Sequence, residues 1–218
     1  GIEYLLSPFT SLPKTGPKTS ELLINLTNGD KIINLLYHQP NSVIVKNYLP
    51  KLYEAKDGEI IIAKVKVESH LIPAVKKQPF RVVCYSPAGY LTLIFFKIFP
   101  GYIEKHFPIG SEIIVSGKID RFNGGLQMTH PDYVRPTKLI DQIPRIEVIY
   151  PLTYGFNQKF LRSKINEILS LITDLPEWLD KNLLQKNSWM SWKDSIIALH
   201  NPKNLDEVDP NNLARRRL

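Results

Sequence analysis

Residues 121–134 read RFNGGLQMTHPDYV, a stretch with a Gly-Gly pair and, a few residues later, a His-Pro pair before an aromatic side chain. Glycine adopts positive φ without steric cost, so Asn123-Gly124-Gly125 predicts a tight turn between two strands. Pro131 lacks a backbone N–H, so we expect it late in the last strand, at an edge or a bulge. The alternative is a metal-binding or catalytic loop, and the residues around the stretch decide between the two.

The chain around this turn, residues 58–135, has the pattern of β-structure. Its apolar runs are EIIIAKVKVES, FRVVCYS, YLTLIFF and EIIVSGKIDRF, and in the last of them Ile113, Val115 and Ile119 share one face. Between the third and fourth runs, PGYIEKHFPIG predicts a short helix near residues 101–107. Three strands, a short helix and two strands are the order of an OB-fold barrel, a scaffold that often binds single-stranded nucleic acid. We therefore expect an α+β protein built on a five-stranded OB-fold β-barrel.

The segments on either side of the barrel have helical patterns. Residues 1–57 contain LPKTGPKTSELLINL, which predicts either half of a helix-hairpin-helix element that grips a phosphate or a plain helix start after a turn. Residues 136–218 contain NQKFLRSKINEILSLI, whose apolar side chains recur on one helical face. We predict three domains: an N-terminal helical segment (1–57), the OB-fold domain (58–135) and a C-terminal helical linker (136–218).

Composition favours a polyanionic partner and a reducing compartment. The 218 residues carry a net charge of +7 and a pI near 9.3, which is weak evidence for nucleic acid. The single cysteine, Cys84, cannot form an internal disulfide and suits the cytoplasm. No apolar run approaches the roughly 20 residues of a membrane-spanning helix, and the first residues lack a signal-peptide pattern. We expect a cytoplasmic protein with no membrane partner.

The sequence offers no set of catalytic residues. None of the glycines begins the GxxxxGK[ST] pattern of a P-loop, and the five histidines are scattered without metal-ligand spacing. Cys84 lies in the middle of a predicted strand, where a small buried apolar role is more common than a nucleophilic one. We predict that this chain by itself has no catalytic residue, no metal site and no cofactor. His130 is either a ligand or base, or a residue that closes a strand with a backbone hydrogen bond.

Aromatic residues are concentrated in YLTLIFFKIFPGY, residues 90–102. Alternation sends Phe95 and Phe96 to opposite faces of a strand, so one is core and the other is either a platform for base stacking or packed against the flanking helices. If this segment binds nucleic acid, we expect basic residues to line the surface, and those of the segment are Lys64, Lys66, Lys76, Lys77, Arg81, Lys97, Lys118 and Arg121.

Several motifs, taken in order, resemble the RecG family of bacterial ATP-dependent DNA helicases. LPKTGPKTSELL is similar to the family's LPGVGPKTAELL, and INLLYHQP to its DLLFHLP. LTLIFFK followed by Tyr102 resembles LTLVFFN…Y, and VSGKIDRFNGGLQMTHPDY resembles VSGKVERFRGGLQMVHPEY almost residue for residue. IYPLTYGFNQKFLRSKI, SIIALHNP and ARRRL resemble YPLTEGLSQKTLRKLI, ALHFP and the start of ARRRLAFEELL.

The resemblance implies an OB-fold wedge that splits parental DNA at a replication fork or Holliday junction. In the family the wedge is attached to a superfamily 2 motor that uses ATP and Mg²⁺ and acts in recombination and repair by fork regression. We expect this chain to be a fragment that ends before that motor, binds branched DNA and hydrolyses no ATP. A monomer near the nucleoid, with single-stranded-DNA-binding protein as a further partner, is also implied. The alternative is a non-catalytic OB-fold adaptor that mediates protein contacts and binds single-stranded DNA weakly.

The resemblance also implies which aromatic residues stack on unpaired bases. The matching positions are Phe96 and Tyr102, with Phe95 as their neighbour. Two departures from the family pattern concern phosphate contacts: Lys14 stands where the family has Gly, and Asn123 replaces a basic residue before Gly-Gly, while Arg121 remains.

Overall fold

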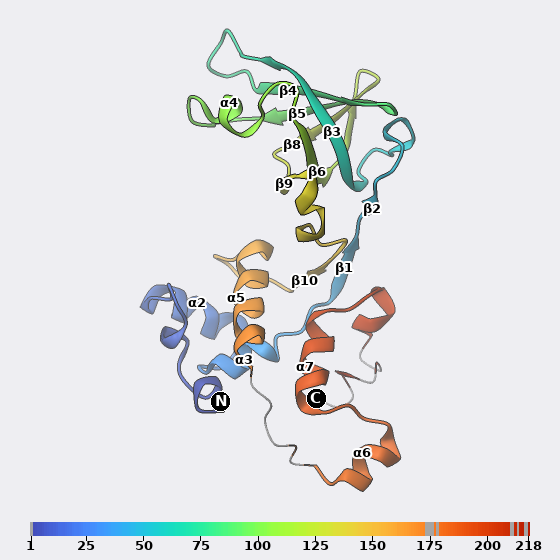
Figure 1. Ribbon diagram of the computed structural model, residues 1–218. Coiled ribbons are helices and arrows are strands. Elements are labelled where there is room, and N and C mark those ends of the chain that lie inside the picture. The colour runs from blue at the N-terminus through green and yellow to red at the C-terminus, as the bar shows by residue number, and fades with distance from the viewer. Residues whose placement is uncertain (1, 173–176, 178, 210–211, 213, 216–217) are drawn as a thin grey trace. The chain divides into compact units, whose positions relative to one another are not determined.

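The structure, a computed structural model, describes residues 2–172, 177, 179–209, 212, 214–215 and 218 (Figure 1). The chain forms two compact units, one made of Gly1–Ile44 with Ile146–Leu218 and the other of Val45–Arg145. The first unit thus takes residues from both ends of the chain. The three domains predicted from sequence, with boundaries after residues 57 and 135, remain a prediction. Two arginines of the C-terminal ARRRL run, Arg216 and Arg217, lie outside the described residues.

The first unit is mainly helical. Its helices are α1 (Ile2–Leu5), α2 (Pro17–Thr27), α3 (Ile32–Leu36), α5 (Gln158–Leu171), α6 (Lys181–Asn187) and α7 (Trp192–His200), and β1 (Ser42–Val45) pairs with β10 (Ile146–Ile149). Helix α5 begins where the Asn157 side chain accepts a hydrogen bond from Phe160 N. The predicted apolar stripe of α5 is confirmed, because Leu161, Ile165 and Ile168 are buried in the core of this unit.

The second unit is mainly β-structure. Its elements are β2 (Asn47–Tyr48), β3 (Ile60–Leu71), β4 (Phe80–Ser86), β5 (Gly89–Phe95), α4 (Tyr102–His106), β6 (Glu112–Lys118), β7 (Asp120–Phe122), β8 (Gly125–Thr129) and β9 (Tyr133–Pro136). Two 3₁₀-helices, η2 (Leu52–Glu54) and η3 (Thr137–Gln142), flank the sheet. The strand order is β7-β8-β5-β4-β3-β6-β9, with β2 parallel to β3.

The α+β class and the OB strand order are confirmed. Strands β3, β4 and β5 form an antiparallel meander, α4 follows, β6 returns beside β3, and β8 runs parallel to β5. The predicted closed barrel of five strands is wrong in its details, because the sheet is open and β7 and β9 are additional strands. The predicted fourth strand divides at Ile119. There the backbone N–H donates to Glu59 O (2.7 Å) and the carbonyl accepts from Gly58 N (2.8 Å), so β7 turns away to pair with β8.

The turn predicted from Gly-Gly is confirmed. Asn123 and Gly124 have φ of 49° and 78°, and Phe122 pairs with Gly125 across the β7–β8 hairpin. Pro131 is a correction: it lies between β8 and β9 and in neither strand. The reason is His130, whose φ of 45° is left-handed and ends β8 one residue earlier.

Two apolar layers cover the β-sheet unequally. The inner face is the core of the unit and includes Val65, Cys84, Leu93 and Phe95. On the outer face of β3 and β6, a second cluster is formed by buried isoleucines with partly buried tyrosines and an isoleucine packed against them: Ile62, Ile114, Ile143, Tyr48, Tyr133 and Ile140. The outer residues of β4 and β5 belong to neither cluster.

Candidate nucleic-acid interface

Strand register brings three of the connecting segments to one end of the sheet. Leu71, at the end of β3, pairs with Arg81, and Arg81 pairs with Ile94 near the end of β5. Ile94 in turn pairs with Thr129, the last residue of β8. We call the segments that leave the sheet there, residues 72–79, residues 96–101 and His130, the loop end.

A different set of turns gathers around Tyr53, whose N–H donates to Ala88 O in the β4–β5 turn (3.2 Å). The carbonyl of Tyr53 accepts from Arg121 at the start of the β7–β8 hairpin. We call residues 53–57, 87–88 and 121–124 the turn end. Figure 1 shows α4 on one side of the sheet and the β4–β5 turn on the other.

At the loop end, Phe95 and Phe96 point to opposite sides, as alternation predicts. Phe95 is 4% exposed, and its ring packs 5.1 Å from Phe107 and 6.0 Å from Tyr102, measured between centroids. Phe96 is 44% exposed. The sequence predicted that one of the two residues is in the core but not which one. The structure shows that Phe95 is the core residue and Phe96 the exposed one, so Phe95 is not a platform for bases.

Tyr102 and Phe99 differ from expectation. Tyr102 is half-buried and packs against the inner core, with its ring 4.4 Å from His106. Phe99, which sequence reasoning noticed in the aromatic run but did not select, is 84% exposed. The signal that could have found it is the Pro100-Gly101 pair that follows. Gly101 has φ of 80° and caps α4, so the residue before the pair lies in the loop and not in the helix.

His130 holds the start of this loop. Its N–H donates to Ile94 O (2.8 Å), and its Nε2 accepts a hydrogen bond from Phe96 N (3.0 Å). A backbone N–H can only donate, so Nε2 is the acceptor in this hydrogen bond. The ring also meets the edge of Phe95 at 5.8 Å. Of the two roles predicted for His130, the structure favours the backbone hydrogen bond at the end of a strand.

The eight predicted basic residues fall into three places. Lys76, Lys77, Arg81 and Lys97 lie in or beside the loop end, and the three lysines among them are exposed. Lys64 and Lys66 project from the outer face of β3. The remaining two, Lys118 and Arg121, lie around Asp57. The structure therefore brings together half of the predicted set with the exposed aromatic residues.

Arg121 is engaged within the protein. Its Nε donates to Ala55 O (2.9 Å), and its Nη2 donates to Ala55 O (2.5 Å) and Tyr53 O (3.1 Å). Its backbone N–H donates to Asp57 Oδ1 (2.8 Å). The guanidinium thus holds η2 against the β7–β8 hairpin.

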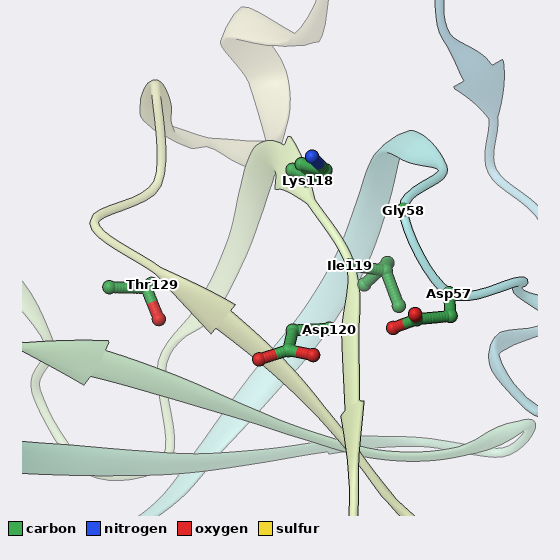
Figure 2. Close-up of a pocket in the computed structure, with 6 residues that line it drawn as sticks. All are labelled: Asp57, Gly58, Lys118, Ile119, Asp120 and Thr129. Atoms are coloured by element: carbon green, nitrogen blue, oxygen red, sulfur yellow. The ribbon is translucent and has the colours of Figure 1, made fainter.

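Lys118 lines a pocket of about 430 Å³ together with Asp57, Gly58, Ile119, Asp120 and Thr129. Figure 2 shows the carboxylates of Asp57 and Asp120 on this pocket. Two carboxylates beside one lysine disfavour a phosphate, because like charges repel at short range. The pocket is thus a poorer phosphate site than the loop end.

Cys84, the one cysteine of the sequence, is buried in the sheet and is not placed to act as a nucleophile. Burial raises the pKa of the Cys84 thiol to about 12, so the thiolate is scarce at neutral pH. Among the residues with described positions, no group of three or more His, Cys, Asp or Glu side chains is arranged to hold a metal ion. Within the same part of the chain, no helix has the length and apolar character needed to cross a membrane.

Taken together, the fold defines the chain as an α+β protein of OB type with a helical unit and an exposed aromatic and basic end. No family model matches the sequence. The sequence is 27% identical over 214 residues to the ATP-dependent DNA helicase RecG of Aquifex aeolicus, covering 94% of this chain and 27% of that protein. It is 26% identical over 178 residues to RecG of Treponema pallidum, covering 75% of this chain and 25% of that protein.

A solved structure, described as RecG bound to a three-way DNA junction, matches the fold with a TM-score of 0.73. The match covers 94% of this chain and 28% of that one at 22% identity. The resemblance to RecG that the motifs predicted is therefore confirmed over nearly the whole chain. This chain spans about a quarter of the length of the RecG proteins that it matches.

Proposed function

We propose that this chain is the branched-DNA-binding wedge of an ATP-dependent DNA helicase of the RecG kind. The observation that carries the proposal is the loop end, where exposed Phe96 and Phe99 flank exposed Lys97 on an OB fold. Exposed aromatic rings stack on unpaired bases, and lysines neutralise the phosphates between them. The similarity to RecG proteins over 94% of the chain supports the same function.

In this proposal the loop end interrupts base stacking at the point where a duplex divides. Phe96 and Phe99 meet the first unpaired bases, while Lys76, Lys77, Arg81 and Lys97 attract the phosphates of the separated strands. His130 and the core residue Phe95 fix the base of the loop, so little freedom is lost when DNA binds.

The chemistry of unwinding lies outside these residues in the proposal. RecG relatives are named as ATP-dependent DNA helicases. In the proposal the longer protein uses ATP and Mg²⁺ and acts in recombination and repair by fork regression. Residues 1–218 alone are inactive towards ATP, because no P-loop pattern occurs in them. The proposal includes a monomeric, cytoplasmic protein that also binds single-stranded-DNA-binding protein.

Binding of the 218-residue chain to labelled DNA tests the proposal. We expect forks and three-way junctions to bind more tightly than a duplex of equal length, with affinity falling steeply between about 50 and 200 mM salt. Equal affinity for fork, duplex and single strand would instead favour the OB-fold adaptor. DNA-stimulated ATP hydrolysis by this chain would contradict the assignment of the motor to another part of the protein.

A further inference from the structure

A row of aromatic side chains crosses the outer face of the sheet, away from the loop end. Lys66 of β3 pairs with Tyr85 of β4, and Tyr85 pairs with Tyr90 of β5. The two tyrosine rings lie 6.2 Å apart and are tilted by 43°. Tyr90 is 60% exposed, and among the residues that the structure describes the second apolar cluster does not extend to this part of the sheet.

The row continues across β8 to β7. Strand β8 runs parallel to β5 with Thr92 opposite Gln127, and alternation places Gly125 on the same face as Gln127 and Tyr90 on the same face as Thr92. Gly125 pairs with Phe122, which is 59% exposed. Residues paired in this way present their side chains on the same face of a sheet. The order across the four strands is therefore Tyr85, Tyr90, Gly125, Phe122.

Gly125 leaves a gap between two exposed aromatic residues. A Cβ built on it would meet only the carbonyl oxygen of Phe122, at 3.5 Å, so the space above the glycine is open. Its φ is not left-handed, so the backbone does not require glycine there. The absent side chain thus gives a planar group access to the facing sides of Tyr90 and Phe122.

Positive charge lies at the β3 side of the row. Lys64 and Lys66, both exposed, line a pocket of about 290 Å³ that also includes Tyr85, Ser86, Pro87 and Glu112. Glu112 lies opposite Lys66 in the register of β3 and β6, so the pocket holds two lysines and one carboxylate. Two lysines beside a row of aromatic rings suit a ligand with planar groups and negative charges in alternation.

We propose that the outer face of β4, β5, β8 and β7 binds single-stranded nucleic acid. Tyr85, Tyr90 and Phe122 stack on successive bases, the gap at Gly125 admits one of them, and Lys64 and Lys66 contact the backbone phosphates. Duplex bases are already stacked and paired, so their faces cannot reach such a row. The proposal rests on the proposed function for the class of ligand, and it assigns a surface to an unpaired arm of the branched DNA.

Two substitutions in the 218-residue chain test the row in opposite ways. Tyr90→Ala removes a ring, whereas Gly125→Val keeps all rings and fills the gap. Tyr154→Ala is the matched control, because Tyr154 is 93% exposed and belongs to the other unit. We expect both test variants to bind a labelled oligothymidylate roughly tenfold more weakly than the parent, and the control to bind it as the parent does.

Fork affinity and unfolding separate the possible outcomes. The variants should keep the parent's urea unfolding midpoint and its affinity for a junction with fully duplex arms. If the parent binds forks but both test variants bind the oligonucleotide as it does, the inference is overturned while the proposed function stands. If the variants bound the oligonucleotide as the parent does but no longer bound a protein partner, the row would be a binding surface for that partner and not for nucleic acid. If the parent binds neither fork nor oligonucleotide, the proposed function fails and the inference fails with it.

Discussion

The loop end and the turn end contain the same kinds of residue but use them differently. Lys97 of the loop end makes no side-chain hydrogen bond or ion pair with the residues that the structure describes, and Phe96 and Phe99 beside it are exposed. Arg121 of the turn end donates to the carbonyls of Ala55 and Tyr53. A basic residue next to an aromatic one is therefore not enough to identify a DNA contact. What matters is whether its donors are already satisfied within the protein.

Phe95 and Phe96 provide the largest expected contrast at the loop end. Phe95→Ala should lower the free energy of unfolding by about 3–5 kcal/mol, because it leaves a cavity among packed rings. Phe96→Ala removes a partly exposed side chain and should cost less than about 1 kcal/mol. Urea unfolding of both variants measures the difference. Equal losses would mean that the two residues share one environment, contrary to the structure.

The exposed aromatic residues should affect DNA and not folding. Phe96→Ala and Phe99→Ala should each weaken fork binding by about 1–3 kcal/mol if they stack on unpaired bases. Tyr102→Ala is the informative comparison, since Tyr102 packs on the core and its loss should lower stability. Fork affinity and thermal unfolding are measured on the same preparations. Unchanged fork affinity in the two phenylalanine variants would remove the loop end from the DNA interface.

Arg121 tests the turn end. Arg121→Lys keeps the charge but replaces the guanidinium, whose planar fork serves two carbonyls, with a single ammonium group. We expect a loss of about 1–2 kcal/mol in the free energy of unfolding and fork affinity close to the parent's. Lys118→Gln is the control, because Lys118 is exposed and lines the pocket beside the same Asp57. If Arg121→Lys weakened fork binding while stability stayed unchanged, Arg121 would contact DNA, as the sequence predicted.

Local patterns predicted the features that depend on neighbouring residues. Alternation predicted the strands, Asn-Gly-Gly predicted the hairpin turn, and the α4 helix lies within the predicted range of 101–107. The bend at Ile119 was not predictable in the same way, since it depends on backbone hydrogen bonds to Gly58 and Glu59. Strand β9 was missed because the left-handed His130 divides what reads as one continuous run.

The candidate site was predictable only in part, for the same reason. Phe96 was selected because adjacent strand residues point apart, which is a local rule. The role of Arg121 depends on carbonyls that lie 66 and 68 residues earlier in the chain, and no nearby residue indicates them. The sequence could therefore give the candidates but not tell which donors were free.

The smallest expected effect concerns the lysines of the two ends. It is a change in the salt dependence of fork binding when one lysine is neutralised. Lys97→Gln should reduce the slope of log K for fork binding against log salt by about 0.7–0.9, because each phosphate contact releases condensed counterions in that proportion. Lys159→Gln, an exposed lysine of the other unit, is the matched control and should leave the slope unchanged. Lys118→Gln should also leave it nearly unchanged, since Asp57 and Asp120 repel phosphate from that pocket. The slope is more informative than a single affinity, because a change in folding would shift the affinity of a variant at every salt concentration. If Lys118→Gln lowered the slope as much as Lys97→Gln does, phosphates would contact both places, and the two ends would not differ in how their lysines are used.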